Sequence, residues 1–324
     1  MLLPRIDRSL RSYSLIAETI ELTQNIVSIC LGNQPFGPIA IKTRAPTLIP
    51  RPETEDWTIR LASLLDDRFP VKGRGERTVL RTLDLCTGTG CIPILLSYLR
   101  RQAGGITVAC GVDISTDAVS LARENATDQS LSPSRGPGCV GSHCDDDPEA
   151  TTKVVETGEA DGRANHGRGT AGAIATSAAD GGGKSTLDVM RADILQEDFV
   201  QVVLSRTETP FDVITSNPPY IPLGEYERLP NSVKEWEDQR ALLGDLPTHG
   251  SGDGSKGRGL MFYHLIARIV SADGVLAAGG IVALEVGHAQ AEEVREILGE
   301  IGGVSATEVW KDPWGVPRVV VGYR

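Results

Sequence analysis

The alternation of apolar runs with helical patterns from residue 78 onward constrains the fold more than any other feature of this chain. TVLRTLDLC (78–86) is typical of a buried strand, and CIPILLSYLRR (91–101) has the spacing of a helix. ITVACGVD (106–113) is a second strand pattern, and TDAVSLARENA (116–126) is a second helix pattern. Strands that alternate with helices predict a parallel sheet with right-handed crossovers.

The same alternation returns in the C-terminal half. LDVMRADIL (187–195) and PFDVITSNPPY (210–220) each indicate an apolar strand that ends in polar residues, and further strand and helix patterns follow. With the last stretch interpreted as a hairpin, the patterns give about seven strands. We therefore predict an α/β fold with a doubly wound, mostly parallel sheet.

Composition divides the chain into a main domain and three other segments. Residues 127–186 are rich in Gly, Ala, Ser, Asp and Thr and contain no aromatic residue, so they bury too little apolar area to offset the entropy of ordering. We expect a disordered insertion there and a smaller loop insertion at 244–259. Residues 1–35 are expected to form a short helical segment, which leaves 36–126 and 187–324 as the main domain.

Charge and cysteine content limit the possible partners. The formal net charge of −11 and the pI of about 5.0 provide no overall positive field for phosphates, so we expect no nucleic-acid partner. No apolar run approaches the roughly 20 residues of a membrane-spanning helix, so we expect no membrane partner.

Six cysteines in 324 residues suit a reducing compartment. CVGSHC (139–144) lacks a second ligand pair at a usual spacing, so we expect no metal site.

Glycines and acidic residues follow the predicted strands at the edge where open sheets bind ligands. Gly88 and Gly90 let a ligand approach bare backbone, but Pro93 stands where a dinucleotide-binding fingerprint needs Gly or Ala. Asp113 can accept hydrogen bonds from both ribose hydroxyls of a nucleoside, or it can cap the following helix. Asp193 can accept from an adenine amino group, or it can serve as a turn residue. Together these groups favour a nucleoside ligand.

The corner NPPY (217–220) carries the strongest indication of chemistry. The side-chain oxygen of Asn217 and the backbone oxygen of Pro218 can accept both hydrogens of a substrate NH2 group. Pro219 stiffens the corner, and Tyr220 offers a flat face to a planar group. Because the lone pair of an amide nitrogen is delocalised, hydrogen bonds that favour a more tetrahedral nitrogen lower the barrier to its reaction. A proline-stiffened surface turn is the alternative interpretation.

Five segments of the chain carry a family resemblance: LIPRPETE (48–55), LDLCTGTGCI (83–92), VDIS (112–115), FDVITSNPPYI (211–221) and LEVGHAQ (284–290). Together they resemble the HemK/PrmC protein-glutamine methyltransferases, over residues 36–126 and 187–324. The resemblance implies a class I S-adenosylmethionine-dependent methyltransferase fold with a seven-stranded sheet. It also implies methylation of the glutamine side-chain amide in the Gly-Gly-Gln loop of a class I peptide-chain release factor, with S-adenosylmethionine as the cofactor.

The resemblance further implies a role for each matching residue. Asn217 and Pro218 would be the catalytic pair that holds the glutamine amide. The expected substrate-binding residues are Pro52, Glu53, Thr54, Asn217, Pro218, Pro219 and Tyr220. The expected cofactor-binding residues are Asp84, Cys86, Thr87, Gly88, Gly90, Asp113, Ile114, Asp193 and Asn217.

Three features depart from the family pattern. Cys86 stands where many members have the first glycine of the turn, which bears on the conformation of that loop. Asp238 replaces the usual proline within VKEWEDQRAL (233–242). The N-terminal helical domain with which bacterial members grip the release factor is expected to be shortened to the segment 1–35.

Two other functions stay open on the sequence. NPPY suits the amino group of adenine or guanine as well as an amide, so base methylation in nucleic acid is one alternative, against which the acidic balance argues. A non-catalytic S-adenosylmethionine-binding or scaffold protein is the other. We expect a monomer, since the sequence contains no obvious assembly device.

The N-terminus bears on localisation. Arg5, Arg8 and Arg11, accompanied by serines, resemble a mitochondrial transit peptide as much as an ordinary amphipathic helix. Long low-complexity insertions suit a eukaryotic member of the family. We therefore expect a mitochondrial protein, with the cytoplasm as the alternative.

Overall fold

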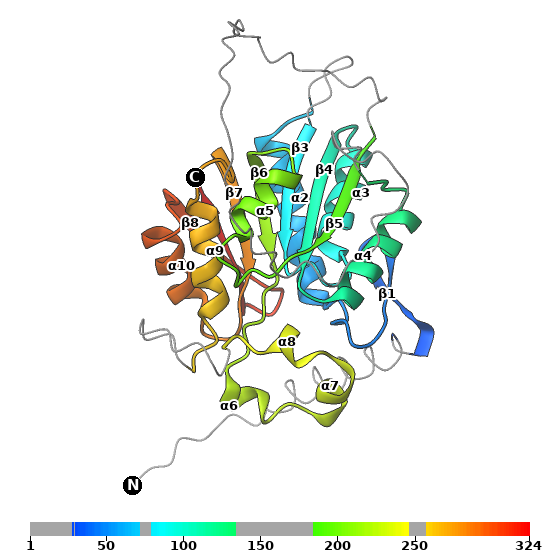
Figure 1. The fold of residues 1–324 in the computed structure, drawn as a ribbon, viewed down its shortest axis with the longest axis vertical. Helices are drawn as coiled ribbons and strands as arrows, with labels where there is room; N and C mark the ends of the chain where they lie inside the picture. The colour runs from blue at the N-terminus through cyan, green and yellow to red at the C-terminus, as the bar shows by residue number, and fades with distance from the viewer. Residues whose placement is uncertain (1–27, 29, 72–78, 134–183, 246–256) are drawn as a thin grey trace, which may run out of the picture. The chain divides into compact units, whose positions relative to one another are not determined.

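A seven-stranded sheet organises the described part of the chain (Figure 1). The computed structural model describes residues 28, 30–71, 79–133, 184–245 and 257–324. The strands are β3 (Val79–Leu85), β4 (Ile106–Asp113), β5 (Thr186–Arg191), β6 (Phe211–Ser216), β7 (Leu276–Glu285), β8 (Ala306–Lys311) and β9 (Pro317–Tyr323). Their spatial order is β5-β4-β3-β6-β7-β9-β8. The pairs from β5 to β7 are parallel, whereas β9 is antiparallel to both β7 and β8.

This strand order confirms the predicted class I methyltransferase fold. From β3 the chain moves outward through β4 to β5, and it then crosses to β6 on the other side of β3. Such a reversal of strand order leaves a crevice beyond the carboxyl ends of the two strands that flank it. Leu85 pairs with Ser216 across this reversal, so the segments that follow β3 and β6 start side by side.

Helices cover both faces of the sheet. They are α2 (Pro52–Arg68), α3 (Cys91–Gln102), α4 (Thr116–Asp128), α5 (Phe199–Arg206), α9 (Met261–Ser271) and α10 (Ala291–Glu300). One core contains residues of α2, α3 and α4, and the other contains residues of α5, α9 and α10. Because both faces are buried, the central strands are mostly apolar and carry apolar residues on both faces. No helix within the described ranges is both long and apolar enough to cross a membrane.

Three short helices form a segment that the sequence did not predict. They are α6 (Leu223–Tyr226), α7 (Asn231–Trp236) and α8 (Gln239–Leu242). Figure 1 shows them beyond the ends of the strands, close to the reversal of strand order. The helix α2 begins at Pro52, where a proline at the first helical position costs no hydrogen bond.

The segment boundaries can be compared with the structure only in part. β1 (Asn33–Phe36) pairs with β2 (Ile39–Lys42), so a strand begins inside the range 1–35 that was predicted to be helical. The helix α4 continues to Asp128, inside the predicted insertion. Most of both predicted insertions, the CVGSHC motif and the N-terminal arginines lie outside the described residues.

Asn125 ties the β1–β2 hairpin to the sheet edge where the site lies. This α4 side chain is 1% exposed. Its Oδ1 accepts from the backbone N–H of Lys42 at 2.8 Å, and its Nδ2 donates to the carbonyls of Lys42 at 3.2 Å and Thr89 at 2.9 Å. One amide therefore holds β2, α4 and the turn before α3 together.

We expect Asn125→Ala to lower the free energy of unfolding by about 2–4 kcal/mol, because three backbone groups, one of them buried, lose their partner. Urea unfolding followed by circular dichroism measures the change. The control is Thr127→Ala, an exposed position on the same helix, which should change stability by less than about 0.5 kcal/mol. Equal losses in the two variants would contradict the role given to Asn125.

Candidate active site

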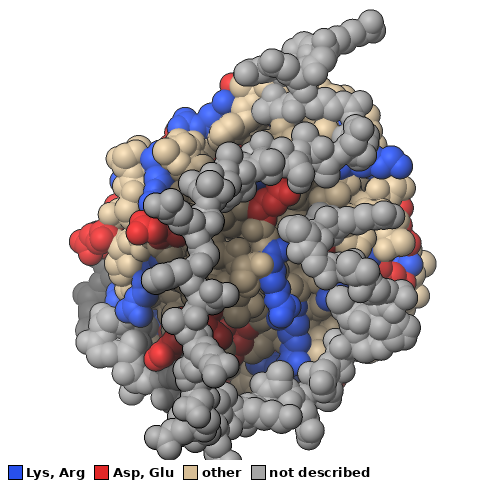
Figure 2. All heavy atoms as spheres, turned by 45° about the horizontal axis from the view of Figure 1, so that its top comes forward, with Lys and Arg blue, Asp and Glu red and all other residues tan. Residues whose placement is uncertain are grey.

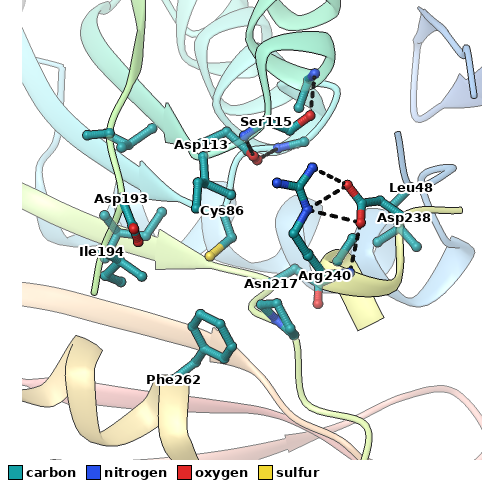
Figure 3. A pocket seen from close by; sticks show the side chains of 18 of the residues that line it. Leu48, Cys86, Asp113, Ser115, Asp193, Ile194, Asn217, Asp238, Arg240 and Phe262 are labelled. Atoms are coloured by element: carbon teal, nitrogen blue, oxygen red, sulfur yellow. Dashed lines mark hydrogen bonds and ion pairs between the residues drawn. The ribbon is translucent and has the colours of Figure 1, made fainter. Parts of the chain in front are cut away.

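Two pockets lie side by side at the carboxyl ends of β3, β4 and β6. The first pocket is lined by residues from the loop before α2, the strand ends, α8 and α9, among them Leu48, Cys86, Gly88, Asp113, Ile114, Asp193, Ile194, Asn217, Pro219, Asp238, Arg240, Ala241 and Phe262. Figure 3 looks into it, with Asp193 and Ile194 on one side and Asp238 and Arg240 on the other. The second pocket includes Arg51, Glu53, Pro218, Tyr220, Arg228, Glu285 and Arg318. Leu48, Asn217 and Ala241 line both.

The turn after β3 presents bare backbone to the first pocket. Cys86, Gly88 and Gly90 all have positive φ angles, of 57°, 55° and 77°. A Cβ on Gly88 would meet no atom within 4 Å, so this glycine leaves open space toward a ligand. A Cβ on Gly90 would come within 3.2 Å of Ala122, so Gly90 permits the close approach of α4. Burial raises the pKa of the Cys86 thiol, which is therefore neutral and not a nucleophile.

Asp113 fixes this turn and faces the pocket. Its Oδ2 accepts from the backbone N–H of Gly88, and its Oδ1 accepts from that of Ser115, both at 2.9 Å. The cap of α4 is Ser115, whose hydroxyl accepts from the N–H of Ala118, so Asp113 is not the helix cap. Burial raises the pKa of Asp113, while the hydrogen bonds from Ser115 and Gly88 lower it. Each carboxylate oxygen keeps a lone pair for a ligand.

Part of the wall of the first pocket is apolar. Ile114, Ile194 and Phe262 line it, and Asp193 is the acidic group among them. Asp193 also forms a turn, because its Oδ1 accepts from the N–H of Leu195 at 2.9 Å. The Asp193 side chain thus both stabilises a turn and lines the pocket, so the two interpretations of the sequence are compatible. A carboxylate at a strand end, bare backbone at Gly88 and apolar walls for a base fit the nucleoside part of S-adenosylmethionine.

Some predicted site residues line neither of these two pockets. Asp84 is 0% exposed and lies beneath the turn, where it accepts hydrogen bonds from the hydroxyls of Thr87 and Thr215, both at 2.6 Å. Burial raises the pKa of Asp84 to about 7. Thr87 itself packs against Gly111 of β4. Asp84, Thr87 and Gly90 therefore hold the turn in place, and direct contact of these three residues with the cofactor stays a prediction.

The predicted substrate residues divide in the same way. Glu53, Pro218 and Tyr220 line the second pocket, whereas Pro219 lines the first. Pro52 and Thr54 line neither of the two. Pro52 starts α2, and Thr54 is 2% exposed beneath Asn217. A part for these two residues in substrate binding stays a prediction.

Asn217 is the residue on which the two pockets meet. Its Nδ2 donates to the hydroxyl of Thr54 at 3.3 Å, and that hydroxyl contacts Glu285 Oε2 at 2.6 Å. Trp57 donates its indole N–H to the same carboxylate oxygen at 2.8 Å. The amide nitrogen of Asn217 thus donates to Thr54. The amide oxygen can accept a hydrogen bond from a ligand at the wall that the two pockets share.

The structure adds residues that the sequence did not single out. Glu285 ends β7 at the same edge of the sheet, so the strand-end rule that found Asp113 could have found it within LEVGHAQ. Gln290 of that segment donates to the backbone oxygen of Tyr220 at 2.9 Å and holds the NPPY corner. No local pattern marks the buried pair of Arg51 and Glu237, at 2.9 Å, which joins the loop before α2 to α7–α8.

Asp238 shows what the departure from the family proline does. Its N–H donates to the carbonyl of Pro46 at 2.8 Å. Its carboxylate caps α8 through the N–H of Arg240 and pairs with that guanidinium at 2.7 Å. The departure therefore places an ion pair at the rim of the first pocket, on the side opposite Asp193 (Figure 3).

We expect Asp113→Asn to weaken binding of S-adenosylhomocysteine at least about tenfold, which corresponds to roughly 1.4 kcal/mol. An amide in this place directs a donor at a backbone N–H and loses the charge that attracts ribose hydroxyls. Isothermal titration calorimetry measures the dissociation constant. Asp117→Asn, at an exposed position on the first turn of α4, is the matched control. Equal affinity in Asp113→Asn and wild type would remove Asp113 from the cofactor site.

Comparison with known proteins agrees with the motifs. The chain is 30% identical over 302 residues to the release factor glutamine methyltransferase of Rhodospirillum rubrum, covering 93% of this chain and 66% of that protein. It is 30% identical over 252 residues to the release factor glutamine methyltransferase of Chlorobaculum tepidum, covering 78% of this chain and 59% of that protein. The chain thus spans less than two thirds of the length of these two relatives.

Two further comparisons complete the result. No family model matches the chain. The solved structure of human methyltransferase 10 domain containing protein matches with a TM-score of 0.48 and 13% identity, over 93% of this chain and 94% of that one. The class I fold therefore rests on the strand order itself. The resemblance predicted from the motifs is confirmed by sequence: the chain is a homologue of the release factor glutamine methyltransferases.

Proposed function

We propose that this protein transfers a methyl group from S-adenosylmethionine to the side-chain amide nitrogen of the glutamine in the Gly-Gly-Gln loop of a class I peptide-chain release factor. The observation that carries the proposal is the place of Asn217. Its carboxamide lies in the wall between a pocket that fits a nucleoside and a second pocket lined by the NPPY corner. A methyl donor and an acceptor nitrogen in these two pockets meet at this residue.

The chemistry follows from the donors and acceptors of the corner. The substrate NH2 group donates one hydrogen to Asn217 Oδ1 and the other to the backbone oxygen of Pro218, which draws the nitrogen away from planarity. These bonds strengthen as the nitrogen lone pair becomes available, so they favour the transition state over the ground state. When bound, S-adenosylmethionine supplies a methyl group on a positive sulfur. The extra proton leaves after the carbon–nitrogen bond has formed, so no strong base is required.

Charges around the second pocket support a protein substrate over nucleic acid. Of the three arginines that line the second pocket, two are engaged by carboxylates: Arg51 is paired with Glu237, and Arg318 is paired with Asp312 at 3.1 Å. Away from the pockets, on the side turned forward in Figure 2, both basic and acidic side chains of the described residues reach the surface. The formal net charge of −11 agrees with this distribution. A phosphate backbone would need unpaired cations along its path.

Mass spectrometry of a release factor after incubation with the enzyme and S-adenosylmethionine tests the proposal. The expected result is a gain of about 14 daltons, one CH2, on the glutamine of the Gly-Gly-Gln loop. RNA and DNA serve as parallel acceptors with labelled cofactor. Label on a base in place of the release factor would establish the base-methylation alternative and contradict the proposal.

We expect Asn217→Ala to lower kcat by about 10²–10³-fold, because one of the two acceptors that favour the tetrahedral nitrogen is lost. The dissociation constant for S-adenosylhomocysteine should change less than tenfold, since most of the first pocket is untouched. Asn33→Ala, in the β1–β2 hairpin, is the control and should keep wild-type turnover. A scaffold protein would show no turnover in wild type and unchanged partner binding in Asn217→Ala.

Two parts of the proposal rest on the sequence alone. We propose a mitochondrial protein from the Arg- and Ser-rich first residues, and import of the tagged chain into isolated mitochondria tests this. We also propose a monomer, which sedimentation measures directly. Neither part affects the chemistry at Asn217.

A further inference from the structure

The orientation of the Asn217 amide depends on a chain of hydrogen bonds that starts at a buried carboxylate. An ionised carboxylate only accepts, and a threonine hydroxyl has a single hydrogen to donate. Thr54 and Glu285 Oε2 are 2.6 Å apart, so the Thr54 hydrogen goes to Glu285. Toward Asn217 the same hydroxyl can then only accept. The Asn217 atom that contacts it must be the NH2 group.

This constraint decides which atom the substrate meets. The carboxamide of Asn217 is nearly symmetric in shape, so packing alone does not distinguish its oxygen from its nitrogen. With the nitrogen held by Thr54 at 3.3 Å, Oδ1 takes the other direction, in the wall between the pockets. A reversed amide would direct its NH2 group at the substrate NH2 group, where two donors repel.

We propose that Thr54 and Glu285 are positioning residues that fix which atom of the Asn217 amide faces the substrate, an inference that rests on the proposed methyl transfer to an amide. Thr54 and Trp57, three residues apart on α2, share the helix face toward the end of β7. Thr54 and Trp57 are 2% exposed and Glu285 is 3% exposed. The network is therefore shielded from water, which would otherwise supply competing donors.

The charge on Glu285 decides which groups donate and which accept in the hydrogen bonds from Glu285 through Thr54 to Asn217. Burial raises the pKa of Glu285, and the hydrogen bonds from Thr54 and Trp57 lower it. The charged neighbours are Glu53 of α2, which raises this pKa, and Arg318 of β9, which lowers it. Three further titratable groups lie close: Cys91 of α3, Tyr220 after β6, and Tyr263 of α9, whose hydroxyl donates to the Glu285 carbonyl at 3.0 Å.

A pH dependence follows from this arrangement. A protonated Glu285 can donate to Thr54, which frees the Thr54 hydrogen for Asn217 Oδ1 and allows the amide to reverse. Turnover should therefore fall as pH drops through the raised pKa of Glu285, closer to neutrality than for an exposed glutamate. Glutamine at 285 keeps an acceptor for Thr54 and Trp57 and does not titrate in this range.

Three variants test the inference with the full chain and a release factor as the acceptor. Thr54→Val keeps the shape and removes the hydroxyl, so kcat should fall by about 10–100-fold while affinity for S-adenosylhomocysteine changes less than threefold. Thr54→Ser restores the hydroxyl and most of the lost turnover. Glu285→Gln should shift the acid limb of the kcat profile to lower pH. Equal turnover in Thr54→Val and Thr54→Ser, or an unchanged acid limb in Glu285→Gln, would overturn the inference.

An assay without substrate separates this inference from the proposed function. In nuclear magnetic resonance of the labelled wild type, nuclear Overhauser contacts should join the Asn217 NH2 protons to the Thr54 methyl group. Absence of these contacts above the pKa of Glu285 would reject the positioning role even in an active enzyme. A wild type that methylates no release factor yet shows the contacts would reject the proposed function and keep the orientation of Asn217.

Discussion

The pairing of β3 with β6 is the constraint on which the site depends. The two strands are parallel and adjacent although five helices and strands separate them in the chain, and Leu85 lies opposite Ser216 where both end. The hydroxyl of Ser216 donates to the carbonyl of Leu85 at 2.7 Å and closes the pair. Because both strands stop at the same level, the glycine turn and the NPPY corner begin next to each other. Neither loop contains the site alone.

Buried carboxylates give this arrangement its rigidity at some cost to stability. Asp84 joins the turn after β3 to Thr215 of β6, and Glu285 joins the end of β7 to α2. Burial raises the pKa of both, so the folded protein opposes their ionisation. A buried network of hydrogen bonds keeps its side chains in a single arrangement when every polar group in it has a partner. The placement of Gly88 and Asn217 depends on that geometry more than on the apolar core around it.

Much of the fold could be predicted because strands buried on both faces leave a continuous apolar signal. The points where these signals stop located Asp113, Asp193 and Asn217 at one sheet edge, and the structure brings all three to the first pocket. The same signal could not show which groups near a strand end reach the ligand. Asp84 and Thr54, for example, make buried hydrogen bonds to other parts of the protein, which the local sequence does not reveal.

What the sequence could not predict depends on long-range contacts and on short elements. Thr54 meets Asn217 across 163 positions and Glu285 across 231, and no local pattern encodes such partners. The helices α6, α7 and α8 have four to six residues each, too few for a helical period to emerge. The segment that carries them supplies Asp238, Arg240 and Ala241 to the pockets.

A crystal structure with S-adenosylhomocysteine and a peptide containing Gly-Gly-Gln is the most direct test of the central claim. The account predicts the ribose at Asp113 and the glutamine NH2 group within about 3 Å of both Asn217 Oδ1 and the Pro218 carbonyl. A glutamine amide bound elsewhere, or facing the nitrogen of Asn217, would contradict it.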